Sequence, residues 1–393
     1  MPKGFAENFL WGASTAAHQI EGNNLNSDWW QIEQGRHGLE RSGDGNDSYH
    51  RFEEDMCLLA DAGLNSYRFS IEWSRIEPSA GHFSRAELAH YRRMIDTAKS
   101  LGLNPIITLH HFTHPVWFEQ QGAWLGEGAV EAFSRYVAFA SEILHDVEYV
   151  ATINEPNMVA MMHGMRASAA RGEEINPSAL KAPDVTIGRV LIQAHQAAVR
   201  VLREKIPAKV GLTMASTAQV ALPGAEAKLQ EVRYVYEDMY LEGCHGDDFV
   251  GVQAYATQLV DENGLVSRTP SPDNTMVGLP YTPEAIGVAV RHTAEVLPEV
   301  AILVTENGIA TTDDTRRIAY TQDALGHLHE AIGEGVNVVG YLHWSALDNY
   351  EWGHWGPTFG LISVDRETFV RTPKPSLAWL GSVAKNNAVP DSD

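Results

Sequence analysis

Two glutamates stand out in this sequence because each ends a short apolar run of the kind that forms buried strands. Glu155 follows the run that starts at Tyr149, and Glu306 follows the run that starts at Ala301. In a parallel barrel, reacting groups gather at the carboxyl ends of the strands. Two carboxylates that converge on one cleft there are the minimum equipment for cleaving a glycosidic bond. The pair therefore predicts both a fold and a reaction.

Cleavage with retention needs one carboxylic acid to protonate the leaving oxygen and a second carboxylate, about 5 Å away, to attack the sugar. A single glutamate at a strand end is often only part of a structural ion pair. Here both glutamates have an asparagine beside them, Asn154 before the first and Asn307 after the second. The repetition of this pattern argues against a structural ion pair and favours a catalytic pair. The distance between the two glutamates in the sequence is no obstacle, because a barrel brings distant strand ends together.

The elements that must hold this pair are visible as short apolar runs that alternate with longer amphipathic segments. The runs are rich in β-branched residues, which is typical of strands buried on both faces. They cover residues 9–13, 66–70, 105–109, 149–154, 209–214, 249–253, 301–305 and 338–344. Eight strands separated by helices predict an α/β protein with a single (β/α)8 TIM barrel domain over residues 1–393. A doubly wound open sheet is the alternative, but no glycine-rich phosphate-binding fingerprint follows the first run.

One intervening helix has clear end signals. Ser84, with Glu87 three residues later, predicts a capping box at its start. Apolar residues recur at helical spacing after it, and Gly102 marks its end. A second helical pattern ends near Gly333, and the polar segment 386–393 is expected to be frayed.

The composition excludes several classes of protein. The chain has 393 residues, 44% of them hydrophobic, and a formal net charge of −22, which disfavours nucleic acid and anionic membranes as partners. Cys57 and Cys244 are the only cysteines, so no disulfide framework is predicted. No apolar stretch approaches the roughly 18 residues of a membrane span, and the first residues lack the apolar core of a signal peptide. We expect a cytoplasmic enzyme that needs no cofactor.

Five strings in a fixed order resemble glycoside hydrolase family 1, the β-glucosidase and β-galactosidase family. The resemblance covers residues 9 to about 379, nearly the whole chain. The strings are FLWGASTAAHQIEG at 9–22, YRFSIEWSRI at 67–76, NEP at 154–156, TENG at 305–308 and WSALDNYEW at 344–352. The resemblance implies the same barrel and a β-glycosidase activity.

By this resemblance, Glu155 is the general acid/base and Glu306 is the nucleophile. A negative Glu306 nearby would disfavour ionisation of Glu155 and keep it protonated for the first step. Arg68 resembles the family's arginine beside the nucleophile, and Tyr255 matches the tyrosine that hydrogen-bonds it. Asn154 matches the asparagine that contacts the 2-hydroxyl of the sugar.

The resemblance also implies a set of residues that bind the sugar. They are Gln19, His111, Asn154, Glu351 and Trp352 as ligands of the hydroxyl groups, Trp344 as the platform under the ring, and Phe112 and Phe359. Members that act on phosphorylated sugars have a small residue at the position of Glu351, followed by basic residues. A carboxylate there would repel a phosphate, so an unphosphorylated sugar is expected.

Three features depart from the family pattern. Phe112 stands where tryptophan usually follows the sugar-binding histidine. The sixth strand ends in Gln253, Ala254 and Tyr255, where Asn-Tyr-Tyr is usual. The connections after Gly308 and between Tyr255 and Ala301 are shorter than is usual in the family. They border the side of the site that binds the leaving group, so the leaving-group preference does not carry over from the family.

The histidines of the segment 110–114 raise the question of a metal site. Adjacent residues on a strand point to opposite faces, whereas metal ligands must converge, so no metal is predicted. We expect a retaining exo-β-glycosidase acting on a small β-glycoside or oligosaccharide of glucose, or of a related sugar such as galactose or fucose. Transglycosylation at the same site, a non-catalytic carbohydrate-binding barrel and a metal-dependent barrel hydrolase are the alternatives. The oligomeric state stays open.

Overall fold

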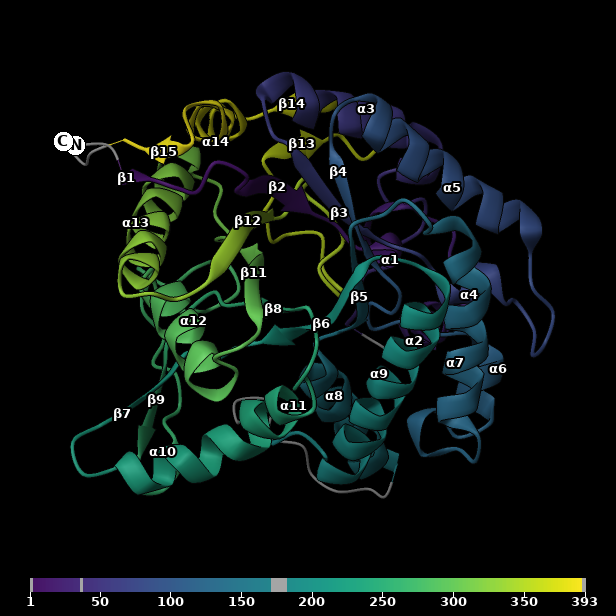
Figure 1. Ribbon diagram of the computed structural model, residues 1–393, viewed down its shortest axis with the longest axis horizontal. Coiled ribbons are helices and arrows are strands. Elements are labelled where there is room, and N and C mark those ends of the chain that lie inside the picture. Colours follow the sequence, from purple (N-terminus) through teal and green to yellow (C-terminus); the bar gives the residue numbers. More distant parts are fainter. Residues whose placement is uncertain (1–2, 36–37, 171–181, 391–393) are drawn as a thin grey trace.

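The computed structural model describes residues 3–35, 38–170 and 182–390. Its centre is a closed barrel of eight parallel strands, ringed by helices (Figure 1). The barrel strands are β2 (Leu10–Ser14), β3 (Ser66–Ser70), β4 (Asn104–Thr108), β5 (Tyr149–Asn154), β6 (Lys209–Ala215), β8 (Phe249–Gln253), β11 (Ala301–Asn307) and β12 (Val338–Trp344). Each predicted strand overlaps one of these, so the (β/α)8 prediction is confirmed and the open sheet is wrong.

Helices occupy the connections between the barrel strands. Their bounds are α1 (Ala17–Ile20), α2 (Asp28–Gly35), α3 (Ser48–Ala62), α4 (Trp73–Ile76), α5 (Arg85–Ser100), α6 (Val116–Gln120), α7 (Ala129–Ala140), α8 (Pro156–Ala170), α9 (Val185–Lys205), α10 (Glu226–Arg233), α11 (Met239–Glu242), α12 (Ala285–Val296), α13 (Asp314–Gly333) and α14 (Pro375–Asn386). Shorter helical turns are η1 (Ala123–Leu125), η2 (Ser141–Ile143) and η3 (Tyr234–Asp238). None of the helices in the described ranges is both long enough and apolar enough to cross a membrane.

The predicted capping box at the start of α5 is only half formed. The Ser84 hydroxyl accepts a hydrogen bond from the backbone N–H of Glu87, as an N-cap should. The Glu87 carboxylate does not complete the box, because it accepts a hydrogen bond from the Tyr49 hydroxyl at 2.9 Å instead. A tertiary contact has replaced the local one.

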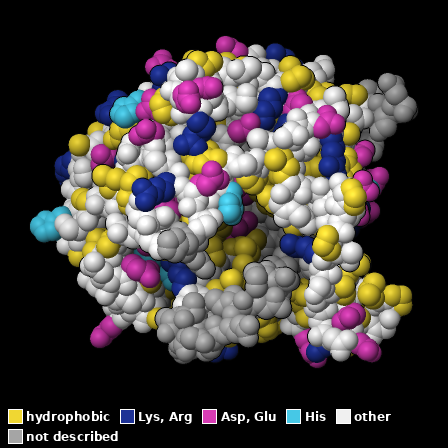
Figure 2. All heavy atoms as spheres, turned by 180° about the vertical axis from the view of Figure 1, so that it is seen from behind, with side chains coloured by type: hydrophobic (Ala, Val, Ile, Leu, Met, Phe, Trp, Pro, Cys, Tyr) yellow, Lys and Arg dark blue, Asp and Glu magenta, His cyan; other side chains and the backbone are white. Residues whose placement is uncertain are grey.

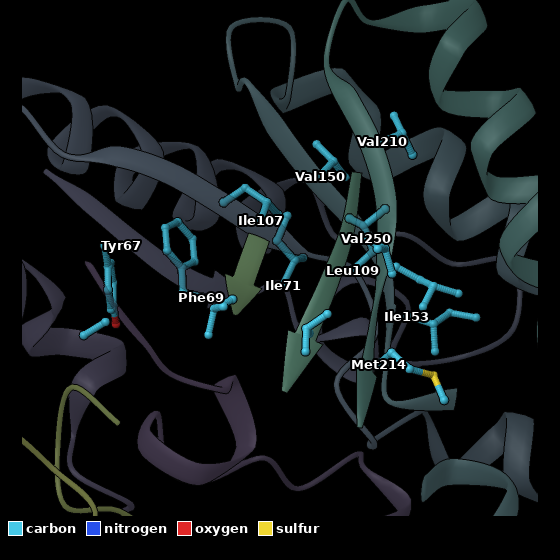
Figure 3. Packing of buried hydrophobic residues seen from close by; sticks show 14 of the residues in the cluster. Tyr67, Phe69, Ile71, Ile107, Leu109, Val150, Ile153, Val210, Met214 and Val250 are labelled. Atoms are coloured by element: carbon cyan, nitrogen blue, oxygen red, sulfur yellow. The ribbon is translucent and has the colours of Figure 1, made fainter. Parts of the chain in front are cut away.

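Alternation along each strand divides the core into two layers. Residues that face the helices, including Tyr67, Phe69, Ile107, Val250 and Met214, form the large outer cluster (Figure 3). Their strand neighbours Ile106, Tyr149, Ala151, Phe249, Leu303 and Leu342 form a separate cluster. Because side chains alternate between faces, this second cluster fills the barrel interior.

The same alternation sends four polar side chains into the barrel from regular strands. Arg68 lies between Tyr67 and Phe69 of the outer layer, so it points inward. Thr108, Thr213 and Gln253 follow the same period on β4, β6 and β8. Their side chains meet in the interior above the apolar cluster.

Two strands break this period, and they are the strands that carry the predicted catalytic pair. On β11 the pairing with β8 shifts between Val304 and Glu306. On β5 the pairing with β6 shifts between Ala151 and Asn154. By simple alternation Glu306 and Asn154 would face the helices, whereas an irregularity of this kind re-aims a side chain. Both therefore enter the barrel.

Three small sheets lie outside the barrel. They are β1 (Lys3–Gly4) with β15 (Ala388–Val389), β7 (Gln219–Ala221) with β9 (Gln258–Asp261) and β10 (Gly264–Leu265), and β13 (Ile362–Val364) with β14 (Arg371–Pro373). The first brings the two ends of the chain together (Figure 1). The expectation of a frayed tail is thus wrong for residues 388 and 389, which pair with β1, while 391–393 lie outside the described residues.

Candidate active site

A fully buried arginine lies at the centre of the polar interior. Arg68 donates from Nη1 to Glu306 at 2.7 Å and from Nε to the Thr108 hydroxyl at 3.0 Å. Its Nη2 donates to Asn154 Oδ1 at 2.5 Å and to the Thr213 hydroxyl at 3.3 Å. A buried charge is tolerated only when it is paired and hydrogen-bonded, and this guanidinium has partners on four other strands.

Glu306 receives hydrogen bonds on both carboxylate oxygens. Its Oε1 accepts from Arg68 and from Gln253 Nε2, each at 2.7 Å. Its Oε2 accepts from the Tyr255 hydroxyl at 2.6 Å. Burial and the nearby carboxylates raise the pKa of Tyr255 well above its usual value, so this phenol stays protonated and remains a donor.

Glu155 lies just past the end of β5, at the junction with α8. Its φ of 47° is in the left-handed region, which few residues other than glycine adopt. The backbone is held there because the Glu155 N–H donates to the Thr213 carbonyl and its own carbonyl accepts from Val159. Strained backbone of this sort is frequent at active sites, where neighbouring structure fixes it.

The two glutamates differ in their electrostatic surroundings. Burial raises the pKa of Glu155 well above its usual value, and the charge of Glu306 raises it further. Burial also raises the pKa of Glu306, but the Arg68 charge and the hydrogen bonds from Tyr255 and Arg68 oppose that rise. No such hydrogen bond stabilises an ionised Glu155 among the described residues. Glu306 therefore ionises first and Glu155 keeps its proton.

A third carboxyl group belongs to the same site. Glu351 accepts a hydrogen bond from the Trp344 indole at 3.1 Å and one from Gln19 Nε2 at 3.4 Å. Burial and the charge of Glu306 raise the pKa of Glu351 to about 8, against the hydrogen bond from Trp344. Gln19 is held by Asn349 and the Tyr350 carbonyl, while its Oε1 is buried without a partner.

Aromatic rings form one wall of the site, and they include residues that the family resemblance assigns to sugar binding. The His111 ring lies nearly parallel to Trp344 and Trp352, with centroids 6.0 and 6.1 Å away. Phe112 has a φ of 66° and packs edge-on against Trp352 at 4.9 Å. Phe359 packs beside Trp344 and Tyr255 in a small buried cluster. All predicted sugar-binding residues thus lie in or against one site.

Gln253, like Thr108 and Thr213, belongs to the site although the sequence analysis assigned it no role. It stands out only as a departure from the family pattern, yet its Nε2 contacts both Glu306 and Asn154. The signal that could have found it is its place at the end of the sixth strand, in phase with the inward-facing Gly251.

Two groups of possible metal ligands lie among the described residues, and neither includes the catalytic pair. One is His114, Glu119 and His163, and the other is His195, Cys244 and Asp247. His114 already bonds Glu119 at 2.8 Å, and His195 lies 2.9 Å from Asp247. Within the histidine segment, only His111 stacks on the aromatic wall of the site, while His110 packs against Trp124.

Two buried carboxyl groups in opposite electrostatic surroundings, at the carboxyl end of a (β/α)8 barrel, define a glycoside hydrolase site. The face shown in Figure 2 is hollowed near its middle, and acidic and hydrophobic side chains line the hollow. Barrels of this kind differ in their substrates through the loops and side chains at this end.

Comparison with known proteins identifies the family. The profile described as "Glycosyl hydrolase family 1" matches residues 1–248 and 244–389. β-Glucosidase A of Thermotoga maritima is 30% identical over 99% of both chains. The solved apo structure of a β-glucosidase named 1317 is 40% identical, with a TM-score of 0.87 over 96% of this chain and 98% of that one. The Thermotoga maritima β-glucosidase in complex with glucoimidazole is 28% identical, with a TM-score of 0.87 over 98% and 99%.

The chain belongs to glycosyl hydrolase family 1. It is a glycoside hydrolase, and its relatives are β-glucosidases.

The coupling of the two glutamates can be measured directly. In Glu306→Gln the pKa of Glu155 should fall, because a neighbouring negative charge that opposes its ionisation is removed. A pH titration of the carboxyl carbon shifts of glutamate by NMR reports this pKa. Glu351→Gln is the control, since Glu351 raises the pKa of Glu155 less than Glu306 does. An equal or larger fall in the control would contradict the assignment.

Proposed function

We propose that this enzyme is a retaining exo-β-glycosidase that hydrolyses unphosphorylated β-glucosides, or β-glycosides of closely related sugars, through a covalent glycosyl-enzyme. The observation that carries the proposal is the asymmetry of the catalytic pair. Glu306 is oriented by three donors, while burial and the charge of Glu306 raise the pKa of Glu155 well above its usual value. Hydrolysis of a glycosidic bond needs one ionised and one protonated carboxyl group, and double displacement is the course expected for a member of this family.

In the first step the Glu306 carboxylate attacks the anomeric carbon of the sugar. The bond to the leaving oxygen breaks, and that oxygen takes the proton of Glu155 as it departs. Glu306 is now an ester, so its negative charge is gone and the pKa of Glu155 falls.

In the second step the ionised Glu155 takes a proton from water, and the resulting nucleophile attacks the anomeric carbon from the face the leaving group occupied. The bond to Glu306 breaks, which restores the Glu306 carboxylate and the protonated Glu155. Two inversions at one carbon give net retention.

Three features support the choice of substrate. The solved structures that resemble the chain include β-glucosidases, one of them in complex with glucoimidazole. Trp344 and Trp352 offer aromatic faces beside His111, and Gln19 and Glu351 offer polar atoms. A phosphate beside Glu351 would lie near the negative charge of Glu306, which is unfavourable.

The first test of the proposal is the anomer that forms first. Proton NMR during hydrolysis of an aryl β-glucoside should show β-glucose before mutarotation produces the α-anomer. An initial α-product would replace the proposed double displacement with a single inverting step.

A second prediction concerns the general acid. Glu155→Ala should lower kcat/KM by several orders of magnitude for alkyl glucosides, but much less for 2,4-dinitrophenyl glucoside, because only the poor leaving group needs protonation. The measurement is kcat/KM across a series of aryl glucosides of rising leaving-group pKa. Equal losses across the series would remove Glu155 from this role.

A third prediction concerns Phe112, which replaces the family's usual tryptophan. Phenylalanine keeps an apolar face toward Trp352 but has no N–H to offer a hydroxyl near the 3-position of the sugar. Phe112→Trp should restore the donor and raise the preference for an aryl β-glucoside over its 3-deoxy analogue by roughly 5- to 100-fold, if the hydroxyl is otherwise buried unpaired. An unchanged ratio of kcat/KM for the two substrates would show that residue 112 does not govern this recognition.

A further inference from the structure

Gln253 is in direct contact with two members of the site. It ends β8, is 1% exposed, and donates from Nε2 to Glu306 Oε1 at 2.7 Å and to Asn154 Oδ1 at 2.9 Å. The two hydrogens of a primary amide nitrogen suffice for two such bonds. A single side chain therefore joins Glu306 to the residue that precedes Glu155.

The orientation of this amide is determined by its neighbours. Both atoms next to Nε2 are acceptors, so turning the amide over would place its oxygen against a carboxylate oxygen and a carbonyl oxygen. The donor contacts of Nε2 therefore decide the orientation, although Oε1 is then buried without a hydrogen-bond partner.

The same contacts decide the orientation of Asn154. Its Oδ1 accepts from Gln253, from Arg68 and from the Thr213 hydroxyl at 2.8 Å. Three donors on the oxygen leave Nδ2 as the free end of the amide, and this nitrogen is buried without a partner. A buried, unpaired N–H group is costly unless a ligand satisfies it.

We propose that Gln253 is a positioning residue of the hydrolytic reaction, holding the Glu306 carboxylate for attack and turning the Asn154 amide so that its nitrogen is presented to a sugar hydroxyl. This inference rests on the proposed function. Gln253 stands where asparagine is usual in the family, and its side chain is longer by one methylene.

Other charged and titratable groups around Glu306 remain when Gln253 is changed. Arg68 of β3 and Tyr255 after β8 donate to the carboxylate, while Glu155 after β5 and Glu351 after β12 are titratable carboxyl groups whose pKa values burial and the charge of Glu306 raise. Loss of one neutral donor makes ionisation of Glu306 less favourable and so raises its pKa. The acid limb of the pH profile, which requires ionised Glu306, should then move to higher pH.

The test compares the protein with Gln253→Met, which keeps length but has no donor, and Gln253→Glu, which keeps shape but has no NH2 group. The substrate is 2,4-dinitrophenyl β-glucoside, whose first step does not depend on the acid Glu155. We expect kcat/KM to fall by about tenfold or more and the acid limb to rise by about half a pH unit or more in Gln253→Met. The loss should be smaller for the 2-deoxy glucoside, which lacks the hydroxyl that Asn154 would meet.

Gln258→Met is the matched control, because Gln258 is also buried and hydrogen-bonded but contacts Val266 and Arg268 away from the site. Its acid limb should match that of the unchanged protein. Thermal unfolding of every variant separates a general loss of stability from a shift of the pH profile. If a variant fails to fold, Gln253→Leu, which also lacks a donor, takes its place, with a shift in the same direction expected.

Unchanged acid limbs and kcat/KM within twofold in the folded Gln253 variants would overturn the inference while leaving the hydrolase intact. A larger effect in Gln258→Met than in Gln253→Met would overturn it as well. If the unchanged protein does not hydrolyse β-glucosides, the proposed function fails first, so the two failures are distinguishable.

Discussion

The site depends on one buried charge. The Arg68 guanidinium has no exposure to solvent, and each of its hydrogen-bond partners lies on another barrel strand. A guanidinium cannot lose its proton at ordinary pH, so the fold must surround it with acceptors. Glu306 supplies the compensating charge, and Thr108, Asn154 and Thr213 supply neutral oxygens. These contacts join β3 to β4, β5, β6 and β11 in the barrel interior.

The chemistry follows from how that pairing treats two carboxyl groups differently. Glu306 shares the buried space with the cation and two further donors, whereas Glu155 has the burial without the donors. Identical side chains thereby differ in how readily they ionise. In the proposed mechanism the charge of Glu306 disappears when this residue is esterified, which lets Glu155 change from acid to base.

Much of this arrangement can be predicted from the sequence, because strands, helix ends and local motifs are encoded in short segments. The eight barrel strands are of this kind, and so are the motifs that carry Gln19, Trp344, Glu351 and Trp352. Simple alternation fails for Glu306 and Asn154, since it would turn both away from the interior. Only pairing with neighbouring strands, in which the register shifts just before each residue, explains their inward direction. The role of Gln253 likewise depends on a contact between two strands, which the sequence of one strand does not show. The Glu87 carboxylate accepts from Tyr49 rather than from the start of its own helix, and this too is a contact between segments that are apart in the sequence.

The proposed double displacement requires a covalent bond between Glu306 and the sugar. It can be tested with 2,4-dinitrophenyl 2-deoxy-2-fluoro-β-glucoside, since the fluorine slows both steps while the good leaving group keeps the first one accessible. Mass spectrometry of the denatured protein, followed by peptide sequencing, locates the bound sugar. Double displacement at Glu306 predicts one 2-deoxy-2-fluoroglucosyl group per chain, attached to Glu306. Attachment to Glu155 or Glu351, or rapid inactivation without any bound sugar, would contradict it.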